Sequence, residues 1–179
     1  MKYFYDTEFI EDGTTIDFIS IGIVAEDGRE YYAVNANMPA RRIRKHEWLM
    51  ANVVPQLPQG SGDRRNHIPA TWVVDYHDPL VKPKMQIRDE VRDFLLSDGK
   101  PELWAWYCAY DHVVLAQLFG PMIELPEGIP MYTHDLRALI DYLPDDELPK
   151  QAGGVHNALE DARWVKQAHA YATREENRP

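Results

Sequence analysis

Two acidic residues interrupt the first apolar segment of the chain, where a strand would normally bury its side chains. Residues 2–10 read KYFYDTEFI, so Asp6 and Glu8 stand among aromatic and aliphatic neighbours. Because strand side chains alternate between faces, residues two apart project from the same face. Adjacent carboxylates in a partly dry site repel each other, and a divalent cation such as Mg²⁺ or Mn²⁺ relieves that repulsion. An acidic pair that faces water is the alternative.

A third acid, Asp111, ends the segment WAWYCAYD, for which we predict a strand over residues 102–110. Sites in sheets covered by helices gather at strand ends, so this acid could join the first two. Alternatively, Asp111 only caps the helix predicted for residues 111–119, a role that aspartate fills well. The side chains that alternate along one face of this strand are more typical of a core than of a base-stacking surface: Trp104, Trp106, Cys108 and Tyr110.

The third chemically suggestive stretch, GGVHNALEDARWV, combines a histidine with an acid at a helix start. Asn157 and Glu160 have the spacing of an N-cap and a capping box, which predicts a helix from residue 157. Five helical steps of about 100° would put His156 and Asp161 on different faces, but a histidine just outside the helix can share a cleft with the acid. Gly153-Gly154 would let the preceding loop bend back. A surface histidine beside a helix is the alternative.

In this order along the chain, the three stretches resemble the DEDDh group of 3′–5′ exonucleases, which includes oligoribonuclease, ribonuclease T and polymerase proofreading subunits. The matching stretches are DTEF with Asp6 and Glu8, AYD with Asp111, and HNALEDA with His156 and Asp161. The third match is the most specific, because H-x-A-L-x-D-A is a strong signature of that group. The resemblance extends over residues 6–165.

More narrowly, WAWYCAYDHVVL and YTHDLRALI look like a small actinobacterial 3′–5′ exoribonuclease class. The chain departs from many relatives at one position. They carry Asn three residues before the aromatic of the second motif, where this chain has Tyr107. The departure concerns a secondary substrate contact rather than the metal site.

The resemblance implies an α/β fold of the ribonuclease H type. We expect a mixed five-stranded sheet, three antiparallel strands and then two parallel ones, with helices on both faces. The implied activity is metal-dependent 3′–5′ exoribonuclease hydrolysis that releases nucleoside 5′-monophosphates from RNA 3′ ends. Two Mg²⁺ or Mn²⁺ ions per active site would be held by four acids: Asp6, Glu8, Asp111 and Asp161.

The resemblance also assigns a role to each of these residues. Asp6 would bridge both ions, and Asp111 would complete the site that supports the leaving 3′-oxygen. Glu8 and Asp161 would complete the site that holds the attacking water. His156 would take a proton from that water, a task that suits imidazole because its unperturbed pKa lies near neutrality.

We assign substrate contacts to Thr7, Phe9 and Tyr110. Phe9 directly follows Glu8 and could stack on a base or act as a wedge, since aromatic stacking does not demand a particular sequence. Plain core packing of Phe9 is the alternative. The THDL stretch around His134-Asp135 is interpreted as a helix cap with a solvated histidine, near the proposed cleft.

The rest of the sequence predicts the elements that must position these residues. Asp27-Gly28 predicts a hairpin between the strand segments TIDFISIGIVAE and REYYAVNA, and a further short strand is expected after Ile129. Residues 56–79 have no clear periodicity, which predicts a functional or mobile loop. Helices are expected over residues 41–55, 83–96, 111–119, the second half of 129–143, and 157–174.

Length and charge bound the class of protein. A chain of 179 residues is long enough for a full core, so we predict one domain over residues 1–179. The formal net charge of −10 argues against a general polyanion binder. Residues 41–88 nevertheless carry nine basic and four acidic residues. The basic run 41–45 is either a solvated face or a track for a phosphate backbone.

Cysteine content and hydropathy bound the compartment. Cys108 is the single cysteine, so no internal disulfide can form, as is usual in a reducing cytoplasm. The N-terminal residues lack the apolar stretch of a signal peptide, and no apolar run approaches the roughly 20 residues that span a bilayer. We therefore expect a cytoplasmic protein that does not bind membranes.

Two alternatives to RNA digestion stay open at this point. The substrate could be single-stranded DNA or dinucleotides, since the sequence exposes no 2′-hydroxyl contact. The scaffold could bind nucleic acid or protein without catalysis, although such degenerate relatives lose acids that are all present here. By resemblance to relatives that complete their cleft with a second subunit, we expect a homodimer.

Overall fold

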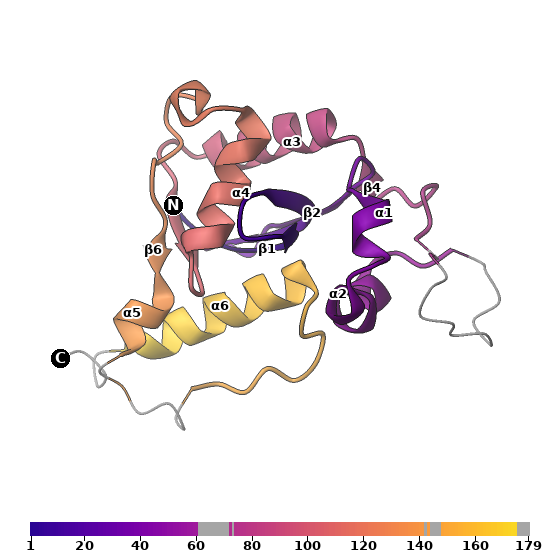
Figure 1. The fold of residues 1–179 in the computed structure, drawn as a ribbon. Coiled ribbons are helices and arrows are strands. Elements are labelled where there is room, and N and C mark those ends of the chain that lie inside the picture. Colours follow the sequence, from indigo (N-terminus) through magenta and orange to yellow (C-terminus); the bar gives the residue numbers. More distant parts are fainter. Residues whose placement is uncertain (61–71, 73, 142, 144–147, 175–179) are drawn as a thin grey trace.

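The fold centres on a six-stranded sheet with the order β4-β3-β2-β1-β5-β6 (Figure 1). The computed structural model describes residues 1–60, 72, 74–141, 143 and 148–174. The strands are β1 (Lys2–Glu11), β2 (Ile16–Ala25), β3 (Glu30–Asn35), β4 (Val81–Lys82), β5 (Glu102–Ala105) and β6 (His134–Asp135).

The predicted mixed sheet is confirmed. β1 pairs antiparallel with β2 and β2 with β3, while β5 runs parallel to β1 and β6 parallel to β5. Asp27-Gly28 forms the predicted turn, with Gly28 at φ 96. The strand count differs by one, because the two-residue β4 pairs parallel with β3. A strand of that length is too short to show an alternating pattern in the sequence.

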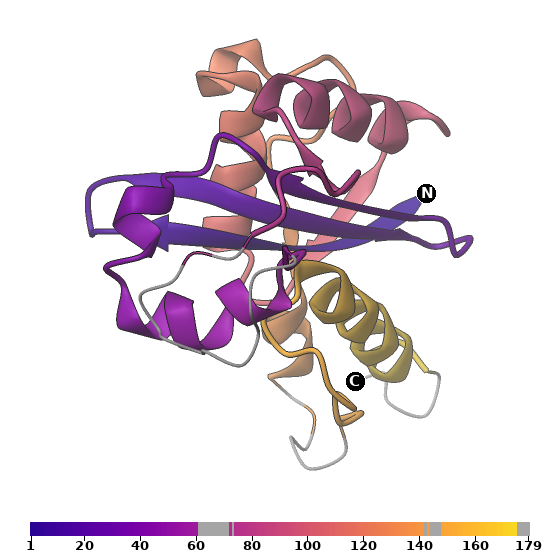
Figure 2. The same ribbon diagram turned by 90° about the vertical axis from the view of Figure 1, so that its right-hand side faces the viewer.

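Helices cover both faces of the sheet, as predicted (Figure 2). On one face, α3 and α4 enclose a core with Tyr3, Tyr5 and Ile21. On the other face, α5 and α6 pack over Phe4, while α1, α2 and a 3₁₀ turn, η1 (Val54–Gln56), pack over Ile19. The helices are α1 (Ala40–Ile43), α2 (Glu47–Asn52), α3 (Lys84–Leu96), α4 (Ala109–Phe119), α5 (Leu136–Ile140) and α6 (Ala158–Ala172).

The predicted strand over residues 102–110 is wrong in its second half. β5 ends at Ala105, a turn follows, and α4 begins at Ala109. Tyr107 adopts a left-handed backbone with φ 51, and its N–H donates to Asp135 Oδ1 over 3.2 Å. The aromatic residues favour a strand locally, but this tertiary contact turns the chain. Trp104, Trp106, Cys108 and Tyr110 therefore do not share one strand face.

The helix predicted over residues 41–55 is two short helices. The break lies at Arg44–His46, where the His46 side chain caps α2 by accepting a hydrogen bond from Leu49 N–H. The basic run is also partly neutralised, because Arg42 pairs with Asp12 and Asp17. A role for this run in tracking phosphates stays a prediction.

The THDL stretch is a cap, as predicted, because Asp135 accepts a hydrogen bond from Arg137 N–H at the start of α5. The expectation of a solvated histidine is wrong. His134 is half-buried and stacks on Trp104 with ring centroids 4.7 Å apart. Before this cap, a two-residue strand joins the sheet beside β5.

The last helix follows its prediction closely. Asn157 is its N-cap and accepts hydrogen bonds from Leu159 and Glu160 N–H. The reciprocal half of the capping box is replaced, because Asn157 N–H donates to Gly154 O and the Glu160 carboxylate pairs with Arg163. The small side chains predicted to pack on the sheet are all buried: Ala162, Val165, Ala168 and Ala172.

Gly22 on β2 lets this helix approach the sheet. A Cβ at this position would stand 2.3 Å from Ala158 O and Leu159 N, so any side chain would push the start of α6 away. Gly22 pairs with Asp6 on β1. The contact therefore holds the N-terminus of α6 directly over the acid-bearing part of β1.

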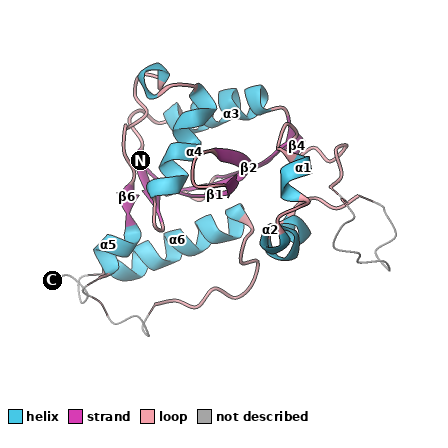
Figure 3. Ribbon diagram, viewed as in Figure 1, coloured by secondary structure: helices cyan, strands magenta, loops and turns pink. Residues whose placement is uncertain are grey.

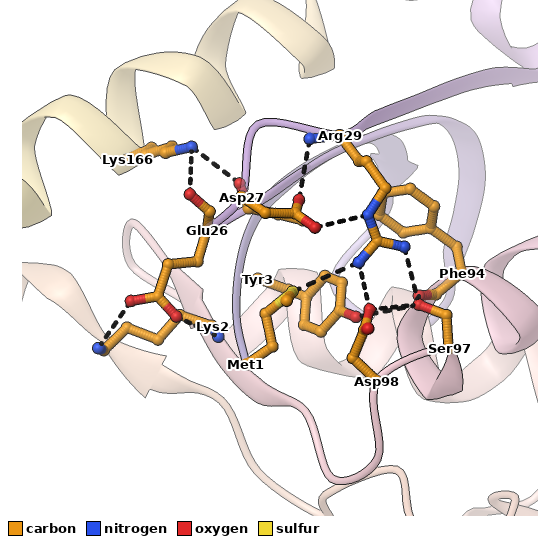
Figure 4. A network of polar contacts seen from close by, with 11 residues as sticks. Met1, Lys2, Tyr3, Glu26, Asp27, Arg29, Phe94, Ser97, Asp98 and Lys166 are labelled. Carbon is orange, nitrogen blue, oxygen red and sulfur yellow. Dashed lines mark hydrogen bonds and ion pairs between the residues drawn. The ribbon is translucent and has the colours of Figure 1, made fainter.

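At the other end of these strands, charged residues pair with one another in a network that we call the paired end (Figure 4). It comprises Lys2, Glu26, Asp27, Arg29 and Asp98. Arg29 joins the β2–β3 hairpin to the end of α3, and Lys166 of α6 donates to Ala25 O and Glu26 O. Lys166 thus ties the middle of α6 to the turn of this hairpin.

The long loop predicted over residues 56–79 is only partly described, since residues 61–71 and 73 lie outside the described residues. Gln59 and Val74 form an isolated antiparallel bridge, and Leu57 and Val74 are buried in the core beside α2. Within the described ranges, no helix combines the length and hydrophobicity that a membrane span requires.

Candidate active site

A cavity of about 750 Å³ lies beside β1 and collects all the residues predicted for catalysis. They come from three elements far apart in sequence: Asp6, Glu8, Asp111, His156 and Asp161. The three predicted substrate contacts line the same cavity: Thr7, Phe9 and Tyr110. The fold thus brings the eight side chains together, and their roles stay predictions.

The two acids of β1 turn toward the α6 side of the sheet. Phe4 packs in the core under α6 and Tyr5 in the core under α4, so strand alternation directs Asp6 and Glu8 to the same side as Phe4. Glu8 is only 8 % exposed. This burial contradicts the alternative of an acidic pair that faces water.

Burial disfavours the ionised form of both carboxylates. It raises the pKa of Asp6 well above its usual range, and the nearby charges of Asp111 and Glu8 raise it further. Burial also raises the pKa of Glu8 to about 8, with added repulsion from Asp161 and Asp111. Among the described residues, no lysine or arginine forms an ion pair with either acid.

Asp111 reaches the cavity from the first turn of α4, beside the part of β1 that no longer pairs with β5. β5 pairs with β1 only as far as Phe4, so Thr7 has no partner strand on that side. Thr7 N–H and Thr7 Oγ1 both donate to Asp111 Oδ1, over 2.9 and 2.7 Å. Burial raises the pKa of Asp111 to about 6, although these two hydrogen bonds oppose the rise.

The alternative role of Asp111 as a helix cap is wrong. The N-cap of α4 is Cys108, and no side chain caps the helix there. Asp111 lies three positions further on, inside the first turn, where the helix dipole favours an anion. Its element was mispredicted, but its position at the cleft was not.

His156 and Asp161 meet in the way that the N-cap spacing predicted. His156 lies outside α6 with a left-handed backbone, φ 67, and its N–H donates to Asp161 Oδ2 over 2.9 Å. Burial raises the pKa of Asp161, against the hydrogen bonds that it accepts from Gln151 and His156. One ligand atom from each of Glu8, His156 and Asp161 lies within 4.8 Å of the others.

The predicted substrate residues divide into two kinds. Phe9 and Tyr110 stack with ring centroids 5.6 Å apart and an interplanar angle of 10°. Tyr110 is 55 % exposed, so the pair offers an aromatic surface beside the acids. Thr7 is buried, and its hydroxyl donates a hydrogen bond to Asp111. The observed contact of Thr7 therefore positions an acid.

Three residues near the predicted ones gave no signal in the sequence. Gln151 Nε2 donates to Asp161 Oδ1 over 2.6 Å, from the loop that precedes α6 (Figure 3). Trp48 of α2 contacts the imidazole of His156. Lys150 is the one lysine or arginine among the described residues that line the cavity. Each is brought there by tertiary structure rather than by a local pattern.

The donor set fits a hard divalent cation. Asp6, Glu8, Asp111 and Asp161 offer carboxylate oxygens, the ligands that Mg²⁺ and Mn²⁺ prefer. In the part of the chain that the structure describes, no ion pair joins any of the four to a lysine or arginine. Burial raises the pKa of Asp6, Glu8 and Asp111, and a bound cation would favour their ionised forms.

The sequence of the chain is similar to those of known proteins. Residues 1–173 match the family described as the 3′-5′ exoribonuclease Rv2179c-like domain. Two curated relatives from Mycobacterium tuberculosis are each 46 % identical to this chain over 165 residues, which cover 91 % of this chain and 88 % of the relative. They are the 3′-5′ exoribonuclease Rv2179c of strain ATCC 25618 / H37Rv and the 3′-5′ exoribonuclease MT2234.1 of strain CDC 1551 / Oshkosh.

Proposed function

The chain belongs to the 3′-5′ exoribonuclease Rv2179c-like domain family, and we propose that it removes nucleoside 5′-monophosphates from the 3′ ends of RNA by metal-dependent hydrolysis. The membership confirms the predicted resemblance to a small actinobacterial 3′–5′ exoribonuclease class. One observation carries the proposal: four carboxylates and a histidine from β1, α4 and the start of α6 line one cavity. We infer that the site is of the DEDDh type.

In this proposal, the four acids hold a pair of Mg²⁺ or Mn²⁺ ions, which would activate a water and offset charge on the leaving oxygen. The charges of Asp111, Glu8 and Asp161 all raise the pKa of Asp6, with Asp111 having the largest effect of the three. Asp6 is therefore near each of the other acids and could share a bound ion with them. Thr7 orients Asp111 through two hydrogen bonds, and Gln151 orients Asp161 through one.

His156 acts as the general base. Its imidazole takes a proton from the water as the water oxygen bonds to phosphorus and the bond from phosphorus to the 3′-oxygen breaks. The ring offers a nitrogen within 4.8 Å of carboxylate oxygens of Glu8 and Asp161, the two acids expected to hold that water. The distance is compatible with a water between the three groups.

Substrate binding in this proposal uses stacking and one positive charge. Phe9 and Tyr110 present the aromatic surface on which the terminal base would stack. Lys150 lines the same cavity and makes no hydrogen bond or ion pair within the described chain. An unpaired lysine beside an acidic site can contact a phosphate of the incoming strand without sequence preference.

We also propose that the chain forms a homodimer through an apolar surface beside the cleft. Exposed side chains of α4, of the turn before it and of the segment before β6 make up this surface: Tyr107, Val113, Met131 and Tyr132. His112 of α4 contacts Thr133, so the two segments are neighbours. Light scattering of the protein, compared with a Val113→Glu variant, tests this. A monomeric unmodified protein would contradict it.

The compartment is proposed on chemical grounds alone. Cys108 is the single cysteine of the chain and has no partner for an internal disulfide. A reducing compartment such as the cytoplasm fits that composition.

Digestion of end-labelled RNA, with Mg²⁺ and with excess chelator, tests the proposed activity. We expect a ladder that shortens from the 3′ end, nucleoside 5′-monophosphate products, and no digestion in chelator. RNA blocked at its 3′-hydroxyl terminus by a bulky group should resist. Cuts inside the chain, or full activity in chelator, would overturn the proposal. A matched DNA oligonucleotide shows whether the sugar is recognised.

A further inference from the structure

An aromatic side chain outside the cavity contacts the proposed base. Trp48 on α2 meets the imidazole of His156 in a T-shaped arrangement, with ring centroids 4.7 Å apart and an interplanar angle of 76°. Trp48 is 49 % exposed and is not among the described residues that line the cavity. It therefore touches His156 from outside the site rather than forming the site itself.

The described chain gives the imidazole no other orienting partner. The backbone N–H of His156 is bonded to Asp161, but no hydrogen bond within the described residues reaches its ring nitrogens. A general base in an active site is usually oriented by a third group, often a carboxylate that bonds its second nitrogen. The carboxylates near His156 are those expected to hold metal ions, so a different kind of group must orient it.

We propose that Trp48 is the positioning residue for His156, holding the imidazole toward the attacking water by ring contact instead of a hydrogen bond. This inference rests on the proposed function. Edge-to-face contact restricts rotation of the imidazole about its side-chain bonds. It also leaves both ring nitrogens without a competing protein partner, so that one can accept the proton.

Core packing and hydrogen bonds hold the segment that carries Trp48 in place. Leu49 and Val53 anchor α2 in the core, and His46 caps the helix at its start. The 3₁₀ turn η1 continues from α2, and Gln56 O in that turn accepts a hydrogen bond from Asn157 Nδ2 over 3.4 Å. The segment that carries Trp48 is thus tied to the residue that follows His156.

A double-mutant cycle on steady-state RNA digestion tests the inference. Trp48→Ala should lower kcat about tenfold and change KM less than about twofold, because the ring is lost from behind the base. In a His156→Ala background the same change should lower kcat less than about twofold, since there is no imidazole left to position. Trp48→Phe should recover most of the lost rate.

Several results would overturn the inference. An equal loss of kcat in both backgrounds would show that Trp48 acts without His156. A rise in KM at constant kcat would make Trp48 a substrate contact. If the unmodified protein digests no RNA, the proposed function fails instead, so the two failures are distinguishable. Tyr76→Ala is the matched control, because Tyr76 is 45 % exposed and lies outside the cavity lining, and its kinetics should not change.

A spectroscopic readout keeps the test independent of turnover and metal. In ¹H–¹³C spectra of the metal-free protein, the His156 ring resonances should carry a ring-current shift that disappears in Trp48→Leu. Leucine keeps apolar bulk at the position, so this variant also serves if Trp48→Ala fails to fold. Unchanged His156 resonances in Trp48→Leu would contradict the contact.

Discussion

The paired end and the cleft carry the same kinds of acidic residue in opposite electrostatic states. At the paired end, a hydrogen bond from Ser97 and the guanidinium of Arg29 lower the pKa of Asp98. Backbone and side-chain bonds from Arg29 lower the pKa of Asp27. At the cleft, burial and neighbouring acids raise the pKa of Asp6 and Glu8.

This difference indicates what the cleft lacks. The chain supplies cations to acids that lie on its surface, yet no lysine or arginine of the described chain pairs with the buried acids of the cleft. Buried unpaired carboxylates destabilise a fold. Their concentration around one cavity is explained if the positive charge comes from solution as divalent metal ions.

The largest expected effect comes from replacing one acid of the cleft by its amide, compared with the same replacement at the paired end. Asp6→Asn should reduce RNA digestion at least about a thousandfold, because the bridging ligand is lost. The metal-free variant should be no less stable than the unmodified protein, since the amide removes a repelling charge. Asp98→Asn at the paired end is the matched control and should digest RNA at the normal rate. Equal activities of the two variants would remove the contrast between the regions.

The next largest effect concerns the base. His156→Ala should lower kcat by about a hundredfold or more, the usual contribution of general base catalysis, with little change in KM for RNA. Steady-state kinetics on a labelled oligonucleotide measure both constants. An unchanged kcat would take His156 out of the mechanism while leaving the metal site of the cleft untouched.

Gly22→Ala tests whether the cleft depends on close approach of α6. The added Cβ would meet the backbone of Ala158 and Leu159 at 2.3 Å. Overpacking of this kind destabilises by about 1–3 kcal/mol, and the shifted helix would also move Asp161 and lower activity. Urea denaturation measures the loss. Gly153→Ala, which meets nothing within 4 Å, is the control, and equal stabilities of the two variants would contradict the argument.

The raised pKa values predict how stability depends on pH. Burial raises the pKa of Glu8 from 4.5 to about 8, so the folded protein keeps the Glu8 proton to a higher pH than the unfolded chain does. That contribution is present in full below the unfolded pKa and is lost as the pH rises through about 8. The metal-free protein should therefore melt a few degrees lower at about pH 8.5 than at about pH 6.5, and Mn²⁺ should raise the melting temperature more at the higher pH.

The pH range in that experiment avoids an opposing contribution to stability from two histidines. Burial lowers the pKa of His112 and of His169 from 6.5, so both add stability as the pH rises toward that value. Above about pH 6.5 their contribution is constant and the cleft acids dominate. A melting temperature that rises from about pH 6.5 to 8.5 without metal would contradict the account of the cleft.

The smallest expected effect lies at the rim of the cavity. Lys150→Ala should raise KM for RNA about threefold and reduce the slope of log affinity against log salt by about 0.7, the value for one phosphate contact on a single strand. Kinetics and binding over a range of salt concentrations measure both. Lys84→Ala on α3 is the control, and identical slopes for the two variants would exclude a phosphate contact for Lys150.

The sequence predicted the parts of the cleft that depend on local rules. Alternation along β1 gave the shared face of Asp6 and Glu8, and the cap at Asn157 placed His156 outside the helix that carries Asp161. The element that carries Asp111 was mispredicted. Its strand ends early because Tyr107 turns on a contact with Asp135, a residue of the neighbouring strand.

The remaining parts of the site are set by contacts between distant segments. Gln151 and Trp48 reach Asp161 and His156 only because the loop before α6 and helix α2 meet there. Gly22 shows its purpose only once Ala158 lies against it. No periodicity or capping rule refers to such pairs, so they emerge only from the structure.

Calorimetric titration of the metal-free protein with Mn²⁺ tests the central claim most directly, because it measures whether the buried acids bind cations without any assumption about substrate. We predict saturable binding of about two ions per chain, with at least one site lost in Asp6→Asn and none in Asp98→Asn. Absence of binding by the unmodified protein, or equal binding by both variants, would contradict the account.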